Sequence, residues 1–217
     1  MPENWTPAGE TEDGLQYGSV LLQNEYIRLK LTNAGASIVD VEVPDQNGDW
    51  GSVAVSAPDL EYYLSNASGL GTTPGRFANR IGRGQFELDG QSYNLAINNG
   101  PNHLHGGNDG FAKRVWQLLD PQKDRVTFRI ISEDGDQGYP GELTLDVSYQ
   151  LDGKDIVIDY KAETDAATVL NITNHTYWNL SGDGKIYDHI LKLNADRVLE
   201  NDSDTLPTGR ILDVADT

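Results

Sequence analysis

Alternation of apolar and polar side chains in the middle of the chain is the feature that most limits its fold. From residue 143 to 151 every second side chain is apolar, and the side chains between them are polar. A period of two is typical of a β-strand with one buried face. Asp152-Gly153 follows, and residues 154–163 carry a second apolar face. An Asp-Gly pair between two such segments predicts a β-hairpin.

Short strand-like segments recur along the rest of the chain. A second pair, Asp89-Gly90, predicts another hairpin. Further strands are predicted at residues 19–24, 26–32, 36–43, 114–120, 125–132, 168–173 and 188–194. Only residues 57–66 have helical spacing. Strands without βαβ alternation predict an all-β fold, a large antiparallel β-sandwich. No repeat or linker is visible, so residues 1–217 are expected to form a single domain.

Composition excludes several classes of partner. The formal net charge is −18, whereas nucleic acids and anionic membrane surfaces attract an excess of Lys and Arg. No apolar segment approaches the length of a membrane span. The chain has no Cys, which excludes disulfides and thiol nucleophiles. The N-terminal segment has neither the basic nor the apolar region of a signal peptide, so we expect a cytoplasmic protein.

Residues 66–110 form a long stretch rich in Gly, Asn, Arg and His, and such stretches in compact domains are usually functional or disordered. His103 and His105 are two residues apart, so on an extended backbone both would face the same way. A metal site would need a third or fourth ligand, and no further His motif supplies one. Gly106 and Gly107 follow directly and allow close approach of a ligand or of another backbone segment.

His175 follows the predicted strand 168–173 and precedes Tyr177 and Trp178. Histidine can donate and accept a proton near neutral pH, because its ordinary pKa is roughly 6.5. Aromatic rings beside it could stack on the C–H face of a sugar. A buried aromatic cluster around a hydrogen-bonded histidine is the alternative, and both interpretations stay open at this point.

Arg76 and Arg80 lie in the same irregular stretch, on either side of Phe77. A planar guanidinium suits a pair of vicinal hydroxyls or a carboxylate. Two surface arginines without a ligand are the alternative.

Several segments resemble the aldose 1-epimerase family, also called galactose mutarotases. They occur in the family's order and cover nearly the whole chain after its first fifteen or so residues. The segments are residues 75–107, 110–116, 134–151, 171–182 and 206–214. The resemblance implies the family's large antiparallel sandwich, a galactose mutarotase-like supersandwich, which agrees with the strand pattern.

The resemblance also implies a role for each matching residue. His175 corresponds to the catalytic acid, and His105 to a catalytic histidine that contacts the sugar near its ring oxygen. Arg80 and Asn79 correspond to residues that bind sugar hydroxyls. Trp178 stands where the family more often has Phe, and we expect it to contact the substrate. The family requires no metal and no organic cofactor, so none is expected here.

The family's catalytic base is a Glu near the C-terminus, beyond the segment that matches residues 206–214. Glu163, Glu200 and Asp213 do not lie in the corresponding motif. We therefore expect the sandwich to lack its C-terminal part. A separate C-terminal fragment or a second copy of the chain would then complete the site.

The function expected from the resemblance is interconversion of the α and β anomers of free aldohexoses such as galactose or glucose. A non-catalytic carbohydrate-binding protein on the same scaffold is one alternative. A hexose-6-phosphate 1-epimerase is another, and it would need a basic cluster for the phosphate. The closest approach to such a cluster in the sequence is Arg76, Arg80 and Arg83.

Overall fold

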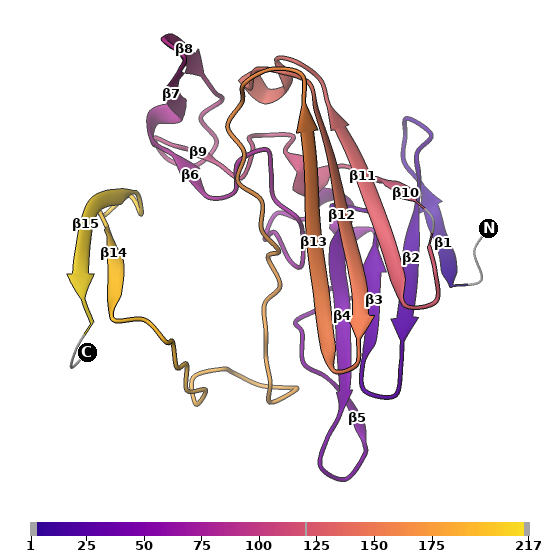
Figure 1. Cartoon of the computed structure of the whole chain (residues 1–217). Helices are drawn as coiled ribbons and strands as arrows, with labels where there is room; N and C mark the ends of the chain where they lie inside the picture. The colour runs from indigo at the N-terminus through magenta and orange to yellow at the C-terminus, as the bar shows by residue number, and fades with distance from the viewer. Residues whose placement is uncertain (1–3, 120, 215–217) are drawn as a thin grey trace.

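The structure, a computed structural model, describes residues 4–119 and 121–214. Two antiparallel sheets face each other and enclose the main core (Figure 1). The first sheet contains β1 (Trp5–Glu10), β2 (Gln16–Gln23), β3 (Arg28–Thr32), β4 (Ser37–Pro44) and β5 (Trp50–Ser52), in that order. The second contains β10 (Gln117–Leu119), β11 (Arg125–Ser132), β12 (Leu143–Asp152) and β13 (Asp155–Thr164). This arrangement confirms the predicted β-sandwich.

Smaller elements complete the fold. Three two-stranded ribbons pair β6 (Arg80–Ile81) with β9 (His103–Leu104), β7 (Gln85–Leu88) with β8 (Gln91–Asn94), and β14 (Arg197–Asn201) with β15 (Pro207–Asp213). The helical elements are α1 (Tyr62–Ser65) and the 3₁₀ turns η1 (Gly82–Gly84), η2 (Phe111–Lys113) and η3 (Asp136–Gly138). Among the described residues, no helix has the length and apolar character needed to cross a bilayer.

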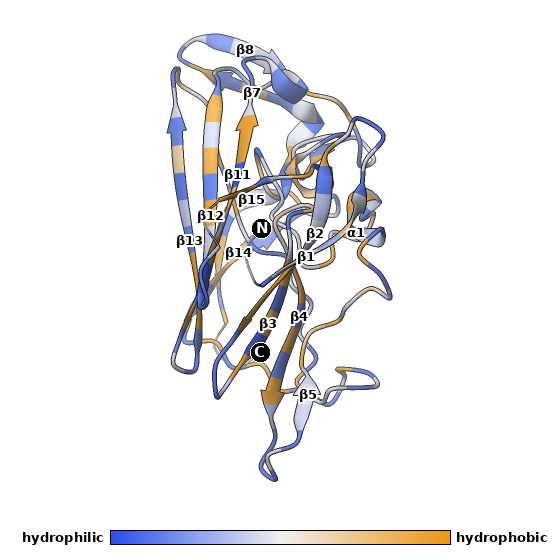
Figure 2. Cartoon of the chain, turned by 90° about the vertical axis from the view of Figure 1, so that its right-hand side faces the viewer, coloured by the Kyte–Doolittle hydropathy of each residue, from blue (hydrophilic) through white to orange (hydrophobic). Residues whose placement is uncertain are grey.

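The alternating strand β12 lies at the centre of the main core. Its apolar side chains pack in one core cluster with those of the first sheet, and Figure 2 colours many residues of β11 and β12 as hydrophobic. The fully buried side chains of β12 and its neighbours are Leu143, Leu145, Val147, Tyr149, Val126 and Phe128, and opposite them lie Val20, Leu22, Leu29 and Leu31. Burying one such side chain stabilises the fold by about 1.5–3 kcal/mol.

Both predicted hairpins are present. At the first, Leu88 pairs with Gln91, and the loop residues Asp89 and Gly90 have φ values of 52° and 78°. Positive φ at both positions is what a type I′ turn requires, and Asp-Gly supplies it at low strain. At the second, the ladder closes at Asp152 and Asp155, so the loop begins at Gly153, one residue later than the sequence pair suggests.

Three predicted elements differ from the structure. The helix expected over 57–66 is a single turn, α1, which Asn66 ends by bonding to the backbone N–H and C=O of Leu70. Residues 168–173 are not a strand, because only Asn171 bridges to a neighbouring segment, at Phe77. Residues 188–194 have no strand beside them in the described structure, so no ladder forms there.

The other predicted strands are present, and all but one of them have shifted ends. Residues 125–132 match β11 residue for residue, whereas the segment 114–120 shortens to β10, and its last residue, Asp120, lies outside the described residues. The irregular stretch 66–110 contains the predicted hairpin β7–β8 and also the short strands β6 and β9, which the sequence pattern did not predict.

Beyond Asn179 the described chain leaves the sandwich and reaches the ribbon β14–β15, which lies on the side of the view opposite β1 (Figure 1). Large apolar side chains in this part face solvent, with exposures of 84% at Tyr187, 96% at Ile190 and 81% at Leu191. Exposed apolar clusters of this kind mark surfaces that another polypeptide can cover.

Arg76 is one of the largest fully buried side chains, and its guanidinium joins three separate segments. It donates hydrogen bonds to the carbonyls of Ser132, Glu133, Pro140 and Gly141 and to the hydroxyls of Ser132 and Thr168. Burial lowers the pKa of this guanidinium, and the nearby carboxylate of Asp136 partly offsets that effect.

Replacing Arg76 by Met should lower the free energy of unfolding by about 3 kcal/mol, because buried carbonyls lose their donors. Urea denaturation followed by circular dichroism measures the change. Arg83→Met is the matched control, since Arg83 is exposed and its change should stay within about 0.5 kcal/mol. Equal effects of the two substitutions would contradict a structural role for Arg76.

Candidate active site

A cavity of about 450 Å³ brings together two of the predicted site residues, His105 and His175. Its wall mixes glycines and small side chains with amides, one lysine and one phenol ring. The lining residues are Asn66, Ala67, Ser68, Gly69, Thr72, Pro74, Asn98, Asn99, Leu104, His105, Gly107, Gly110, Ala112, Lys113, His175 and Tyr177. A concave site with a few convergent polar groups is typical of small-molecule binding.

A tight backbone turn places His105 in this cavity. The ribbon β6–β9 aligns Arg80 with Leu104, and directly after it His105 adopts a φ of 51°. Gly106 follows with a φ of 82°, and a Cβ at this position would overlap the carbonyl of Gly75. Only glycine fits such a close approach. The backbone at His105 is therefore not extended, contrary to the expectation that placed His103 and His105 on one side.

Asn79 fixes the orientation of the His105 ring. The N–H of Asn79 donates to Nδ1 of His105 at 2.9 Å, and the N–H of His105 donates to the carbonyl of Asn79 at 3.1 Å. Because Nδ1 accepts a hydrogen bond, the proton of the neutral ring lies on Nε2. His105 can therefore donate from Nε2 to an oxygen atom in the cavity.

The surroundings of His105 keep its imidazole neutral. Burial lowers its pKa to about 4, with further contributions from His175 and Arg80. The unfolded chain, in contrast, would bind a proton on this ring at roughly pH 6.5. As the pH falls from the unfolded value to the folded one, this difference favours the unfolded state, so the contribution of His105 to stability decreases.

His175 is held against the opposite wall by its backbone. Its N–H donates to the carbonyl of Thr72 at 2.8 Å, and its own carbonyl accepts from Gly71. Its ring meets the His105 ring edge to face, with centroids 5.4 Å apart and planes at 89°. The Tyr177 ring lies 5.1 Å from it on another side. Two imidazoles and one phenol ring thus border the same space.

Arg80 and Asn79 lie beside the cavity. Arg80 donates from Nε to the side chain of Asn99 at 3.1 Å and from Nη1 to that of Asn79 at 3.2 Å. Asn99 itself lines the cavity. The side-chain oxygens of Asn79 and Asn99 thus orient the guanidinium of Arg80 at the edge of the cavity.

Trp178 lies on the other side of its strand-like segment. It bridges to Ala54 and is about half exposed, and it does not line the cavity. Tyr177 lines the cavity instead, and its hydroxyl donates to the carbonyl of Ser68. The contact between the rings of His175 and Tyr177 places Tyr177 on the histidine's side.

Two residues singled out in the sequence have structural partners. His103 is fully buried, with Nδ1 bonded to the carbonyl of Ala96 and Nε2 to the hydroxyl of Tyr139, both at 2.7 Å. Arg76 lies in the interior, as described above. Arg76, Arg80 and Arg83 therefore do not form the basic cluster that a phosphate would need.

The wall of the cavity, within the described residues, contains no carboxylate. Glu163 pairs with Lys161 at 2.8 Å on an exposed surface, and Glu200 pairs with Arg210 in the ribbon β14–β15. Asp213 lies at the end of β15. Among the described residues, the cavity thus brings together two histidines and several hydrogen-bonding groups but no carboxylate.

Comparison with known proteins places the chain in a family. The family model for aldose 1-epimerase matches residues 18–217. The chain belongs to the aldose 1-epimerase family. Galactose mutarotase from Bos taurus is 44% identical over 200 residues, which cover 90% of this chain and 58% of that protein. Aldose 1-epimerase from Escherichia coli (strain K12) is 36% identical over 217 residues, covering 99% and 62%.

Solved structures in this family have the same architecture. An aldose epimerase homologue from C. elegans superposes with a TM-score of 0.89 at 32% identity, over 93% of this chain and 62% of that one. Galactose 1-epimerase from Lactobacillus acidophilus NCFM gives 0.88 at 30% identity, over 99% and 63%. The chain thus spans about three fifths of the length of these relatives.

The hydrogen bond from Asn79 should be visible in ¹⁵N NMR of the histidine rings. We expect His105 to titrate with a pKa of about 4 and to carry its proton on Nε2 above that pH. His175→Asn should raise this pKa, because it removes a neighbouring imidazole. Tyr177→Phe, which leaves both histidines in place, is the control and should not change it. An unshifted pKa in the wild-type chain would contradict the neutral-donor geometry.

Proposed function

We propose that the cavity catalyses the interconversion of α and β anomers of free aldohexoses. The observation that carries the proposal is the pair of imidazoles, His105 and His175, facing each other at 5.4 Å in one cavity. Membership of the aldose 1-epimerase family supports the same reaction.

The reaction needs an acid and a base on opposite sides of the anomeric carbon. Protonation of the ring oxygen and removal of the proton from the anomeric hydroxyl open the ring to the free aldehyde. Rotation about the adjacent C–C bond and closure on the other face give the second anomer. Each positioned acid or base typically contributes about 10²–10⁴-fold to the rate.

In this proposal His175 protonates the ring oxygen, and His105 donates a hydrogen bond from Nε2 to the same region. The lowered pKa of His105 supports that division, because a neutral imidazole orients the substrate without competing as the acid. Arg80 and Asn79 bind sugar hydroxyls at the edge of the cavity. Trp178 remains a candidate substrate contact from the sequence, and Tyr177 is added because it lines the cavity.

The base is proposed to be a carboxylate supplied by a separate C-terminal segment or by a second copy of the chain. The wall formed by the described residues contains none, and the relatives are longer than this chain. Apart from this source of the base, the proposed partner of the site is a small neutral sugar. We propose that the protein acts in the cytoplasm. Residues 1–217 are proposed to act as one domain.

Polarimetry of freshly dissolved α-D-galactose and α-D-glucose tests the activity. We expect little acceleration by residues 1–217 alone and a large acceleration after addition of the separately expressed C-terminal segment of the Bos taurus relative. Sugar binding without acceleration in either sample would instead favour a non-catalytic carbohydrate-binding protein. Acceleration by a verified monomer of 217 residues would overturn the proposed source of the base.

Substitution of His175 should separate the acid from the binding residues. In the sample that accelerates mutarotation, His175→Ala should lower kcat by about 10²–10⁴-fold. His189→Ala is the matched control, because His189 is exposed and its ring contacts Ser181 outside the cavity. A loss of less than about tenfold for His175→Ala would assign the acid to another group.

A further inference from the structure

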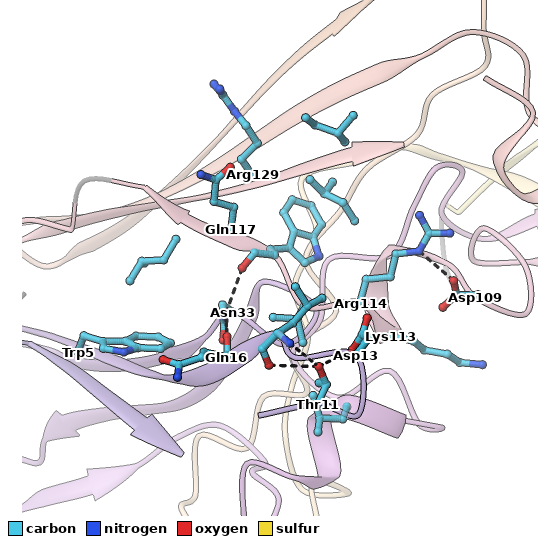
Figure 3. Close-up of a pocket in the computed structure, with 17 residues that line it drawn as sticks. Trp5, Thr11, Asp13, Gln16, Asn33, Asp109, Lys113, Arg114, Gln117 and Arg129 are labelled. Atoms are coloured by element: carbon cyan, nitrogen blue, oxygen red, sulfur yellow. Dashed lines mark hydrogen bonds and ion pairs between the residues drawn. The ribbon is translucent and has the colours of Figure 1, made fainter. Parts of the chain in front are cut away.

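A second, larger cavity of about 790 Å³ lies outside the histidine site (Figure 3). It opens between the first two strands of one sheet and β10 and β11 of the other. The residues that define its floor and opening are Trp5, Gln16, Asn33, Trp116 and Gln117. We call this cavity the edge cleft. Its volume falls within the range of about 300–1,000 Å³ that small-molecule sites occupy.

The floor of the edge cleft is rigid. Trp116 is 1% exposed, and its indole N–H donates to the carbonyl of Phe111 at 3.0 Å. The side chain of Asn33 accepts from Gly18 and donates to the carbonyls of Gln16 and Trp116. Every polar group of these two side chains is thus used within the protein, so the floor is a preformed surface.

An aromatic ring and two amides border the opening. Trp5 is partly buried and packs over Gly18, whose missing Cβ leaves room for the indole. The side-chain amides of Gln16 and Gln117 are exposed and have no hydrogen-bond partner within residues 4–119 and 121–214. Figure 3 shows Trp5 and Gln16 on one wall and Gln117 on the other. A ligand between them would meet one ring face and free donors and acceptors.

Most charges in the edge cleft are already paired. Arg114 holds Asp136 in a bidentate ion pair at 2.6 and 2.7 Å, and Arg129 holds Asp146 in the same way. Asp13 accepts from the hydroxyl of Thr11. Paired arginines are poor binding groups for a phosphate or a carboxylate, because their guanidinium N–H groups already donate to a carboxylate. The edge cleft therefore favours a neutral ligand with many hydroxyls.

We propose that the edge cleft is a non-catalytic binding site for a neutral oligosaccharide. An indole face suits the C–H side of a pyranose, and amide groups both donate to and accept from hydroxyls. The edge cleft is larger than the histidine cavity, about 790 Å³ against 450 Å³. The edge cleft therefore has room for more than one sugar ring. Binding here is independent of the mutarotase reaction and needs neither His105 nor His175.

Isothermal titration with methyl glycosides of maltotriose, cellotriose and galactotriose tests the site. These probes have no free anomeric hydroxyl, so mutarotation cannot contribute to the signal. We expect at least one to bind with a Kd of about 0.1–5 mM. Trp5→Ala should raise that Kd at least about tenfold, and Gln117→Ala at least about threefold.

Matched controls lie elsewhere on the chain. Trp50→Ala removes another partly buried indole, and Gln46→Ala removes an exposed amide in the turn before β5. Both should leave the Kd within about twofold, as should the double variant His105→Ala/His175→Ala. If Trp5→Ala does not fold, Gln117→Ala decides the test. The proposal is overturned if no probe binds at about 10 mM, if Gln117→Ala leaves the Kd unchanged, or if the double variant abolishes binding.

Discussion

The buried guanidinium of Arg76 holds together the segments on which the histidine site depends. It lies three residues before Asn79, the residue that fixes the His105 ring. Its acceptors include Ser132 and Pro140, at the two sides of the loop that carries Tyr139, which in turn bonds His103. A buried charge with this many acceptors stabilises one arrangement of the three segments, because any other arrangement leaves it unsolvated.

The chemistry of the histidine pair follows from what surrounds it. A backbone N–H occupies Nδ1 of His105, and burial together with a second imidazole lowers its pKa. Identical residue types therefore acquire different roles by position, since among the described residues a backbone N–H bonds to the ring of His105 but none to that of His175. An acid-base pair needs this asymmetry, because two equivalent imidazoles would compete for the same proton.

Periodicity predicted the sandwich strands well, because β11 and β12 bury one face each and the alternation reports that burial directly. Periodicity failed at residues 168–173 and 188–194, because in the described structure neither segment has an adjacent strand with which to form a ladder. The motif resemblance identified His105 and His175, and the structure places them in one cavity. The motif resemblance could not show that Tyr177, not Trp178, lines the cavity. Which of the two side chains does so depends on which face of the segment after His175 is turned toward the cavity.

The edge cleft and the histidine cavity share a wall, which the sequence does not reveal. Lys113 lines both, and the turn η2 that carries it begins at Phe111, a core residue stacked edge to face on Trp116. The N–H of Phe111 bonds to Gly75, next to Arg76. The turn is thus anchored to the core and to the arginine network at the same point. Because this wall is anchored by backbone hydrogen bonds and a buried aromatic pair, we expect binding in the edge cleft to leave the histidines in place.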